Sequence, residues 1–215
     1  MDWKGRVNVA DIVTFNTTNG RVYGNYDRPL TVTSPPFVTS FPKLTRADIE
    51  RSQDKGIRVV NYEADITMKG ATERHNNFKA FMDDLDELLL AHMISTDASL
   101  NASQARYMLK SLFKARRSIK TGIDYPEGMN CRSKIAIDNV DRYPVVDSNN
   151  RPYMSDIQQD DIIRVQLTYR GPYYIRNSWF GNSWELSAVQ FCGRHEEAPP
   201  CFHPVDPTEF PTLSK

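Results

Sequence analysis

Aromatic rings and arginines are interleaved in one stretch of the sequence, residues 162–193. Between its two strand-like segments lie Tyr173, Tyr174, Arg176, Trp179 and Phe180. Flat aromatic side chains can stack on unpaired nucleobases, and arginine can neutralise a phosphate. The stretch is therefore a candidate surface for single-stranded nucleic acid. The alternative is an ordinary β-hairpin whose rings fill a hydrophobic core.

Cations recur at regular spacing in a second segment, residues 101–121, which contains no acid. Its four regularly spaced bases step by four, four and three residues, which places them on one face of a helix. A face without acids suits phosphate, whereas the alternative is a solvated helix surface. From charge and aromaticity, the predicted nucleic-acid contacts are Tyr23, Arg28, Arg106, Lys110, Lys114, Arg117, Arg132, Lys134, Arg164, Arg170, Tyr173, Tyr174, Arg176 and Trp179.

Motifs of catalysis are absent from the sequence. It has no phosphate-binding G-x-x-x-x-G-K-[ST] loop, no G-x-S-x-G elbow and no H-E-x-x-H pair. Asp83, Asp84, Asp86 and Glu87 could suggest a metal-dependent nuclease, but adjacent carboxylates on a helix diverge, which favours a solvated face. We therefore expect a protein that is not an enzyme and needs no cofactor.

Zinc ligands are present near the C-terminal end, but their spacing is poor. The candidates are Cys192, His195, Cys201 and His203. Only one residue separates Cys201 from His203, which is too few for an ordinary tetrahedral zinc site. We expect no metal. Three cysteines, an odd number, fit reduced thiols better than a disulfide framework.

Overall charge and hydropathy exclude several classes of protein. The 215 residues contain 27 basic and 27 acidic side chains, which argues against binding through bulk positive charge. About 40% hydrophobic residues can build a core. No apolar run approaches the roughly 18 residues of a membrane span, and the first residues lack the apolar centre of a signal peptide. The expectation is an intracellular, non-secreted protein without a membrane partner.

Periodicity predicts strands, then two helices, then strands. Strands are expected within 31–70, including 57–68 with Val60, Tyr62, Ala64 and Ile66 facing the core, at 131–137, and in the pair within 162–193. Helices are expected at 76–94, where His92 is a partly buried core residue, and at 102–119. This order favours a mainly β (α+β) fold, an OB-type five-stranded antiparallel Greek-key barrel with two helices between its halves.

Three parts follow from this organisation. Residues 1–30 form an extension, either a hairpin with Asn19-Gly20 at its tip or a poorly ordered arm. Residues 31–193 form the OB-type domain, with the helical insertion at about 76–119. Residues 194–215, rich in proline, form a flexible tail.

Six segments between residues 31 and 193 occur in a suggestive order. They read SPPFVTSFPKL, IRVVNYEADITMKGA and NNFKAFMDDLDELL, then YPVVD, QDDIIRVQL and GNSWELSAVQF. Together they resemble the phage-type single-stranded-DNA-binding proteins. The resemblance implies an OB fold, sequence-independent binding of single-stranded DNA in viral replication or recombination, and a place in the infected host cell. It also implies Lys69 as a phosphate contact. The weakly acidic end of the chain departs from the acidic tails of replication binders.

The same residues suggest binding partners and one alternative function. Single-stranded DNA is the expected partner, and replication proteins and a second copy of the chain are further partners that this interpretation allows. Because protein interfaces also favour Tyr, Trp and Arg, the alternative is a viral structural or assembly protein that uses the aromatic hairpin as an interface.

Overall fold

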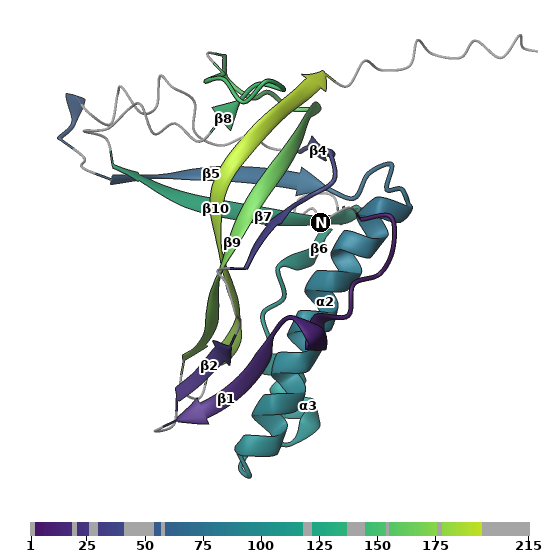
Figure 1. Ribbon diagram of the computed structural model, residues 1–215, viewed down its shortest axis with the longest axis vertical. Coiled ribbons are helices and arrows are strands. Elements are labelled where there is room, and N and C mark those ends of the chain that lie inside the picture. Colours follow the sequence, from purple (N-terminus) through teal and green to yellow (C-terminus); the bar gives the residue numbers. More distant parts are fainter. Residues whose placement is uncertain are drawn as a thin grey trace, which may run out of the picture.

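The computed structural model describes residues 3–18, 21–25, 30–40, 54–56, 59–117, 122–136, 145–153, 155–175 and 178–194, with the backbone alone at 21, 25, 59–61, 116 and 132–136. Its elements in chain order are the 3-10 helix η1 Val9–Asp11, β1 Thr14–Thr18, β2 Arg21–Asn25, β3 Thr31–Thr33, β4 Phe37–Thr39, β5 Val59–Thr67, α2 Glu73–Thr96, α3 Ala102–Met108, β6 Phe113–Arg117, β7 Asp124–Ala136, β8 Val145–Val146, β9 Asp161–Ile175 and β10 Trp179–Arg194 (Figure 1). Neither α-helix of this described part has the length and apolarity that a membrane crossing requires.

The described strands form a large sheet and a separate hairpin. The eight-stranded sheet has the order β6-β7-β5-β4-β9-β10-β8, with β3 also paired to β9, and β1 pairs only with β2. The strand pairs are antiparallel except β10 with β8. The predicted mainly β fold with helices is confirmed. The sheet is open in the described residues, since β6 and β8 end the path, so the predicted closed five-stranded barrel is not what its hydrogen bonds form.

The long strand β9 follows the predicted alternation. Ile163, Val165, Leu167 and Tyr169 are buried, while Arg164 and the other residues between them point to the opposite, more exposed face. One prediction about this region is wrong. The sequence predicts a long aromatic loop between the two strands, but its described residues, 171–175 and 179–182, are paired strand, because β9 continues to Ile175 and β10 begins at Trp179. Backbone pairing satisfies the amide groups of these residues, which a loop would leave to water.

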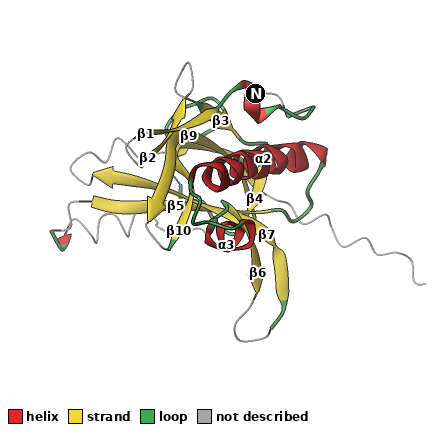
Figure 2. Cartoon of the chain, turned by 90° about the horizontal axis from the view of Figure 1, so that it is seen from below, coloured by secondary structure: helices red, strands yellow, loops and turns green. Residues whose placement is uncertain are grey.

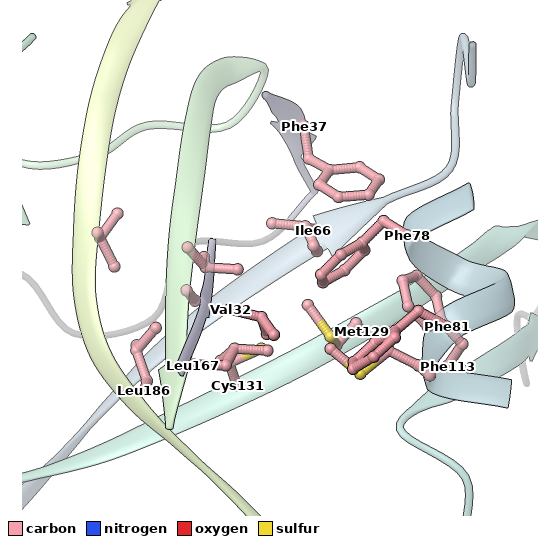
Figure 3. Close-up of a cluster of buried hydrophobic side chains, with 14 of the residues drawn as sticks. Val32, Phe37, Ile66, Phe78, Phe81, Phe113, Met129, Cys131, Leu167 and Leu186 are labelled. Atoms are coloured by element: carbon pink, nitrogen blue, oxygen red, sulfur yellow. The ribbon is translucent and has the colours of Figure 1, made fainter. Parts of the chain in front are cut away.

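Helix α2 closes one side of the sheet with aromatic side chains. Its apolar residues recur at helical spacing, and Phe78, Phe81 and Leu85 are buried. The Phe78 ring centroid lies 5.8 Å from that of Phe37 on β4 and 6.1 Å from that of Phe113 on β6. Figure 3 shows these rings side by side, in contact with the interior of the sheet. The predicted helix at 76–94 is confirmed and is slightly longer.

The first residues are part of this core. Trp3 is buried, its ring centroid lies 4.9 Å from that of Phe78, and its indole N–H donates to the carbonyl of Thr33 over 2.6 Å. The hairpin predicted in residues 1–30 is present, with Thr18 opposite Arg21, and its predicted tip, Asn19-Gly20, lies outside the described residues. The segment before the hairpin therefore contributes to the main core instead of extending away from it.

The predicted helix at 102–119 is wrong beyond its first two turns. Asn101, one of two residues that the sequence offers as the N-cap besides Ser99, caps α3, but the helix ends at Met108, Leu109 is extended, and residues 113–117 form strand β6. Helix propensity is a weak preference that tertiary contacts override. Here β6 gains its hydrogen bonds from β7 and buries Phe113 beside Phe78. The row of bases therefore does not lie on one helical face.

A second, smaller core joins the helices to the far end of the β9–β10 hairpin. Phe180 of β10 is fully buried among Leu89, Leu90 and Met93 of α2 and Ala105 of α3. The β1–β2 hairpin packs against the same cluster. Figure 1 shows the β1–β2 hairpin, the lower ends of β9 and β10, and α3 at one end of the molecule. That end is therefore a packed unit and not a free ribbon.

Asp86 is buried between these elements, which corrects its assignment to a solvated helix face. Its carboxylate accepts a hydrogen bond of 2.8 Å from the Asn182 amide, whose oxygen accepts one of 2.7 Å from the Tyr169 hydroxyl. Ser111 also donates to it, and burial raises the pKa of Asp86 to about 6. The network holds α2, β9 and β10 in one arrangement.

We predict that Asp86→Asn changes how stability depends on pH. Because the folded pKa of about 6 exceeds the unfolded value of 3.8, Asp86 stabilises the fold most below pH 3.8, and this contribution is lost as pH rises through 6. The free energy of unfolding of the wild type, relative to Asp86→Asn, should fall by about 2–3 kcal/mol over this range. Urea unfolding at several pH values measures it. Asp84→Asn, which removes an exposed acid of the same helix, is the control, and an equal effect there would contradict the prediction.

Candidate nucleic-acid interface

Three exposed aromatic rings and one lysine meet where α3 ends beside the β9–β10 hairpin. Tyr107 is 84% exposed, Trp179 45% and Tyr174 38%. The Lys110 ammonium lies 5.9 Å from the ring centroid of Tyr107 and 5.5 Å from that of Trp179. We call these four residues the aromatic platform. Cations this close to ring faces are attracted by the ring electrons, so Lys110 helps to hold both rings in place.

Backbone contacts fix the aromatic platform to the second core. The Lys110 amide donates to the carbonyl of Phe180 over 2.8 Å, and Leu109 forms a parallel bridge with Phe180. Gly181 allows this approach: a Cβ atom there would lie 2.6 Å from the Lys110 carbonyl oxygen. Since Phe180 is buried under the helices, its neighbour Trp179 is turned outward at a defined position.

The hairpin changes direction just before the aromatic platform. Gly171 has φ +97°, a conformation that glycine adopts readily, and the register of β9 and β10 shifts between Ser183 and Trp184. Tyr173 beyond this point is half-buried. Burial raises the pKa of its phenol, and the Asp86 carboxylate raises it further. Tyr173 is therefore a packing residue more than a stacking surface, unlike its neighbour Tyr174.

A pocket of about 370 Å³ opens beside the aromatic platform. Tyr107 and Tyr174 form part of its wall, and polar groups of the α2–α3 connection and of the hairpin turn form another part. Its lining residues are Asp97, Ser99, Leu100, Gln104, Tyr107, Met108, Tyr174 and Ser178.

Lys69, the phosphate contact implied by the family resemblance, lines a separate cleft of about 660 Å³. Arg74 lies on the same wall at the start of α2, and Pro35, Pro36 and Ile162 form apolar parts of the lining. In the described part of the chain neither cationic side chain forms an ion pair. Glu73 and His75 also line the cleft, which therefore combines two cations without an ion pair in the described part, one acid and an apolar wall.

Other predicted cations are already neutralised. Arg106 forms a two-pronged ion pair with Glu87 at 2.7 and 2.6 Å, which ties α3 to α2. Arg170 pairs with Glu185 on the neighbouring strand. Arg117 donates to the carbonyl of Gly122 over 3.0 Å and lies 3.7 Å from the Asp124 carboxylate. A phosphate would have to compete with these carboxylates.

The remaining predicted contacts are scattered over the molecule. Lys114 is exposed on β6, in the β6–β7 hairpin that projects from the body beside α3 (Figure 2), and Arg164 is exposed on β9. Tyr23 on β2 is 46% exposed at the end of the molecule that carries the aromatic platform (Figure 1). The side chains of the four remaining predicted contacts are not described. Only the backbone is described for Arg132 and Lys134, and Arg28 and Arg176 lie outside the described residues.

The acids of α2 do not converge. Asp83 accepts a hydrogen bond of 2.6 Å from Lys79, and Asp84 lies 3.6 Å from Arg6, so each carboxylate faces a different cation. Among the described residues no group of His, Cys, Asp and Glu could hold a metal ion. Of the candidate zinc ligands only Cys192 lies in the described residues, so the expected absence of a zinc site stays a prediction.

His92 is half-buried, as predicted from its place on the apolar face of α2. Its Nε2 lies 2.9 Å from the Thr17 hydroxyl of β1, and burial lowers its pKa. It therefore helps to attach the β1–β2 hairpin to the helix.

Tyr107, the most exposed ring of the aromatic platform, is not among the contacts predicted from the sequence. A signal was available: Tyr107 precedes Lys110 by three residues, so on a helix the two side chains are neighbours on the polar face. An aromatic residue on the polar face of a helix has no core to fill. The proximity of this pair to Trp179 depends on the tertiary structure.

We predict that Gly181→Ala disrupts the aromatic platform. Its new Cβ would meet the Lys110 carbonyl oxygen at 2.6 Å and the Tyr173 hydroxyl at 3.1 Å, so the hairpin and the end of α3 must separate. We expect a loss of about 1–3 kcal/mol in the free energy of unfolding, measured with urea. Gly5→Ala, where no atom lies within 4 Å of the added Cβ, is the matched control. Equal stability of the two variants would contradict the prediction.

Comparison with known proteins finds similarity only to solved structures. No protein-family model and no curated protein matches the chain. Among the solved structures that match are single-stranded-DNA-binding proteins of bacteriophages. Protein gp2.5 of phage T7 is 12% identical, with a TM-score of 0.44 over 79% of this chain and 89% of that one. The phage Enc34 protein is 12% identical, with a TM-score of 0.47 over 92% of this chain and 97% of that one. The Enc34 protein in complex with single-stranded DNA is 11% identical, with a TM-score of 0.42 over 86% of this chain and 97% of that one. Values this low assign no residue role to this chain.

Proposed function

We propose that this protein binds single-stranded DNA, with bases stacked on the aromatic platform and phosphates held by nearby cations. The observation that carries the proposal is the exposure of Tyr107, Trp179 and Tyr174 around Lys110 on a rigid support. Each base stacked on such a ring contributes about 1–3 kcal/mol whatever its sequence. With zero net charge, the chain cannot depend on bulk attraction to phosphate, so stacking becomes the main source of affinity.

Lys110 gives the aromatic platform its link to the phosphate backbone. Its ammonium has ring faces as neighbours and no carboxylate partner among the described residues, so it is available to a phosphate next to a stacked base. The platform is held in place before a ligand arrives, because Phe180 and Lys110 are joined through the backbone. Binding therefore costs little additional ordering of the protein.

The wider role is part of the same proposal. We infer a non-catalytic protein that protects and organises single strands during viral DNA replication or recombination in an infected host cell. Its sheet would be a strongly bent variant of an OB-type barrel, since β7 contacts β10 although three strands separate them in the sheet order. The resemblance of residues 31–193 to the phage-type single-stranded-DNA-binding proteins motivates this inference.

The alternative, a viral assembly protein that uses the same rings as an interface, predicts a different behaviour. Rings buried between copies of the chain would give a stable oligomer in size-exclusion chromatography that single-stranded DNA does not alter. A complex that forms only when DNA is added supports the binding function.

We predict that two variants of Trp179 distinguish base stacking from the fluorescence quenching that reports it. Trp179 is 45% exposed, whereas Trp3 is buried and Trp184 is half-buried, so quenching of tryptophan fluorescence by oligo-dT should come mainly from Trp179. Trp179→Phe should lose the quenching and keep most of the affinity, measured by anisotropy of labelled DNA. Trp179→Ala should bind roughly 5–150-fold more weakly, as expected for one lost stacking partner.

The control is Tyr125→Ala, which removes a ring that is 50% exposed on β7 outside the aromatic platform. It should bind oligo-dT like the wild type. If Trp179→Ala also binds like the wild type, the platform does not stack bases and the proposal fails.

We predict that the cations of the cleft contribute to the salt dependence of binding. If Lys69 and Arg74 each contact a phosphate, changing both to Gln should reduce the slope of log K against log salt by about 1.4, that is about 0.7 for each contact. Arg151→Gln, which removes an exposed cation elsewhere, is the control and should leave the slope almost unchanged. An unaltered slope in the double variant would exclude the cleft from the DNA path.

A further inference from the structure

The pocket beside the aromatic platform has the size and walls of a nucleobase site. Its volume of about 370 Å³ exceeds that of a purine ring, and Tyr107 and Tyr174 supply aromatic surface at its edge. Leu100 and Met108 add apolar lining. A base that leaves the stack on the aromatic platform could therefore enter the pocket while its phosphate stays outside.

The charges of this region favour a base over a phosphate inside the pocket. Among the described residues of the lining, Asp97 has the only charged side chain, and it is negative. Hydrogen bonds from the Ser99 hydroxyl and amide hold the pKa of Asp97 below its ordinary value, so it stays ionised at neutral pH. A phosphate would be repelled there. Lys110, the nearest cation of the aromatic platform, does not line the pocket and can hold the phosphate outside it.

The polar groups of the pocket present a defined pattern. The Ser99 amide and hydroxyl donate to one oxygen of Asp97, at 3.0 and 2.5 Å, which orients the carboxylate. An ionised carboxylate only accepts hydrogen bonds. Gln104 accepts one of 3.4 Å from the Asn101 amide through its oxygen, so its amide hydrogens remain available, as does the Ser178 hydroxyl, within the described part of the chain.

We propose that this pocket takes one nucleobase of the bound strand and prefers guanine. The inference rests on the proposed function. Guanine is the base whose Watson–Crick edge carries two adjacent donors, N1–H and the N2 amino group, and the Asp97 oxygen that is not bonded to Ser99 can accept from both. Its O6 can accept from Gln104 or Ser178. Adenine and cytosine place a ring-nitrogen acceptor beside their amino group, and thymine places a carbonyl on each side of N3–H, so a carboxylate repels part of each edge.

The test compares labelled oligo-dT of about 12 nucleotides, a length within the usual range for such proteins, with the same strand carrying one central dG, dA, dC or deoxyinosine. A single dG avoids guanine association between strands. The wild type should bind the dG strand about three- to tenfold tighter than oligo-dT, and deoxyinosine, which lacks the N2 amino group, should lose most of that gain.

Asp97→Asn is the deciding variant, because its side-chain oxygen can still accept from Ser99 and keep the local turn. It should bind oligo-dT at least as tightly as the wild type and show a dG preference below about twofold. Asp124→Asn removes an equal charge outside the pocket and should keep the preference, which controls for electrostatics. A wild type without dG preference, or a preference that survives in Asp97→Asn, overturns the proposal while oligo-dT binding stands. Failure to bind any strand overturns the proposed function itself.

Discussion

The burial of Phe180 between α2 and α3 is the interaction on which the functional end of the molecule depends. A two-stranded ribbon is only marginally stable alone, and the last residues of β9 and the first residues of β10 form such a ribbon at one end of the molecule. Phe180 anchors this ribbon in the second core. Two residues further along β10, Asn182 donates a hydrogen bond to the buried Asp86 carboxylate. Because side chains alternate along a strand, the burial of Phe180 turns Trp179 to the surface. The position of the exposed rings is thus a consequence of packing.

The buried Asp86 carboxylate, which connects α2 to the β9–β10 hairpin, has an energetic cost and a structural benefit. Removing Asp86 from water is unfavourable, which its raised pKa of about 6 expresses. The hydrogen bonds of Asn182 and Ser111 offset part of that cost and require the three segments to meet in one geometry. An apolar contact would tolerate sliding of the hairpin along the helix, whereas a hydrogen-bonded acid does not. This accounts for a single polar group inside an otherwise apolar helix face.

Charge pairing explains why the predicted cations differ in their availability. Arg106 and Arg170 lie next to carboxylates of neighbouring elements, so their charges stabilise the fold. Lys110 and Lys69 lie beside rings or at a cleft without an acid partner in the described part. A chain of zero net charge can therefore present local positive sites only where its acids are absent. The acid of the pocket, Asp97, has the opposite effect and keeps phosphate out.

The sequence by itself determined the mainly β class with helices, the alternation of β9, the helix at 76–94 and the aromatic, arginine-rich character of the hairpin, because these depend on periodicities within one segment. It could not show that residues 109–117 leave the helix, since pairing with β7 and the burial of Phe113 outweigh local helix preference. Nor could it show which bases are neutralised, or that Tyr107 and Trp179 meet around Lys110. These facts depend on contacts between residues far apart in the chain, and only the tertiary structure decides which distant groups share a surface.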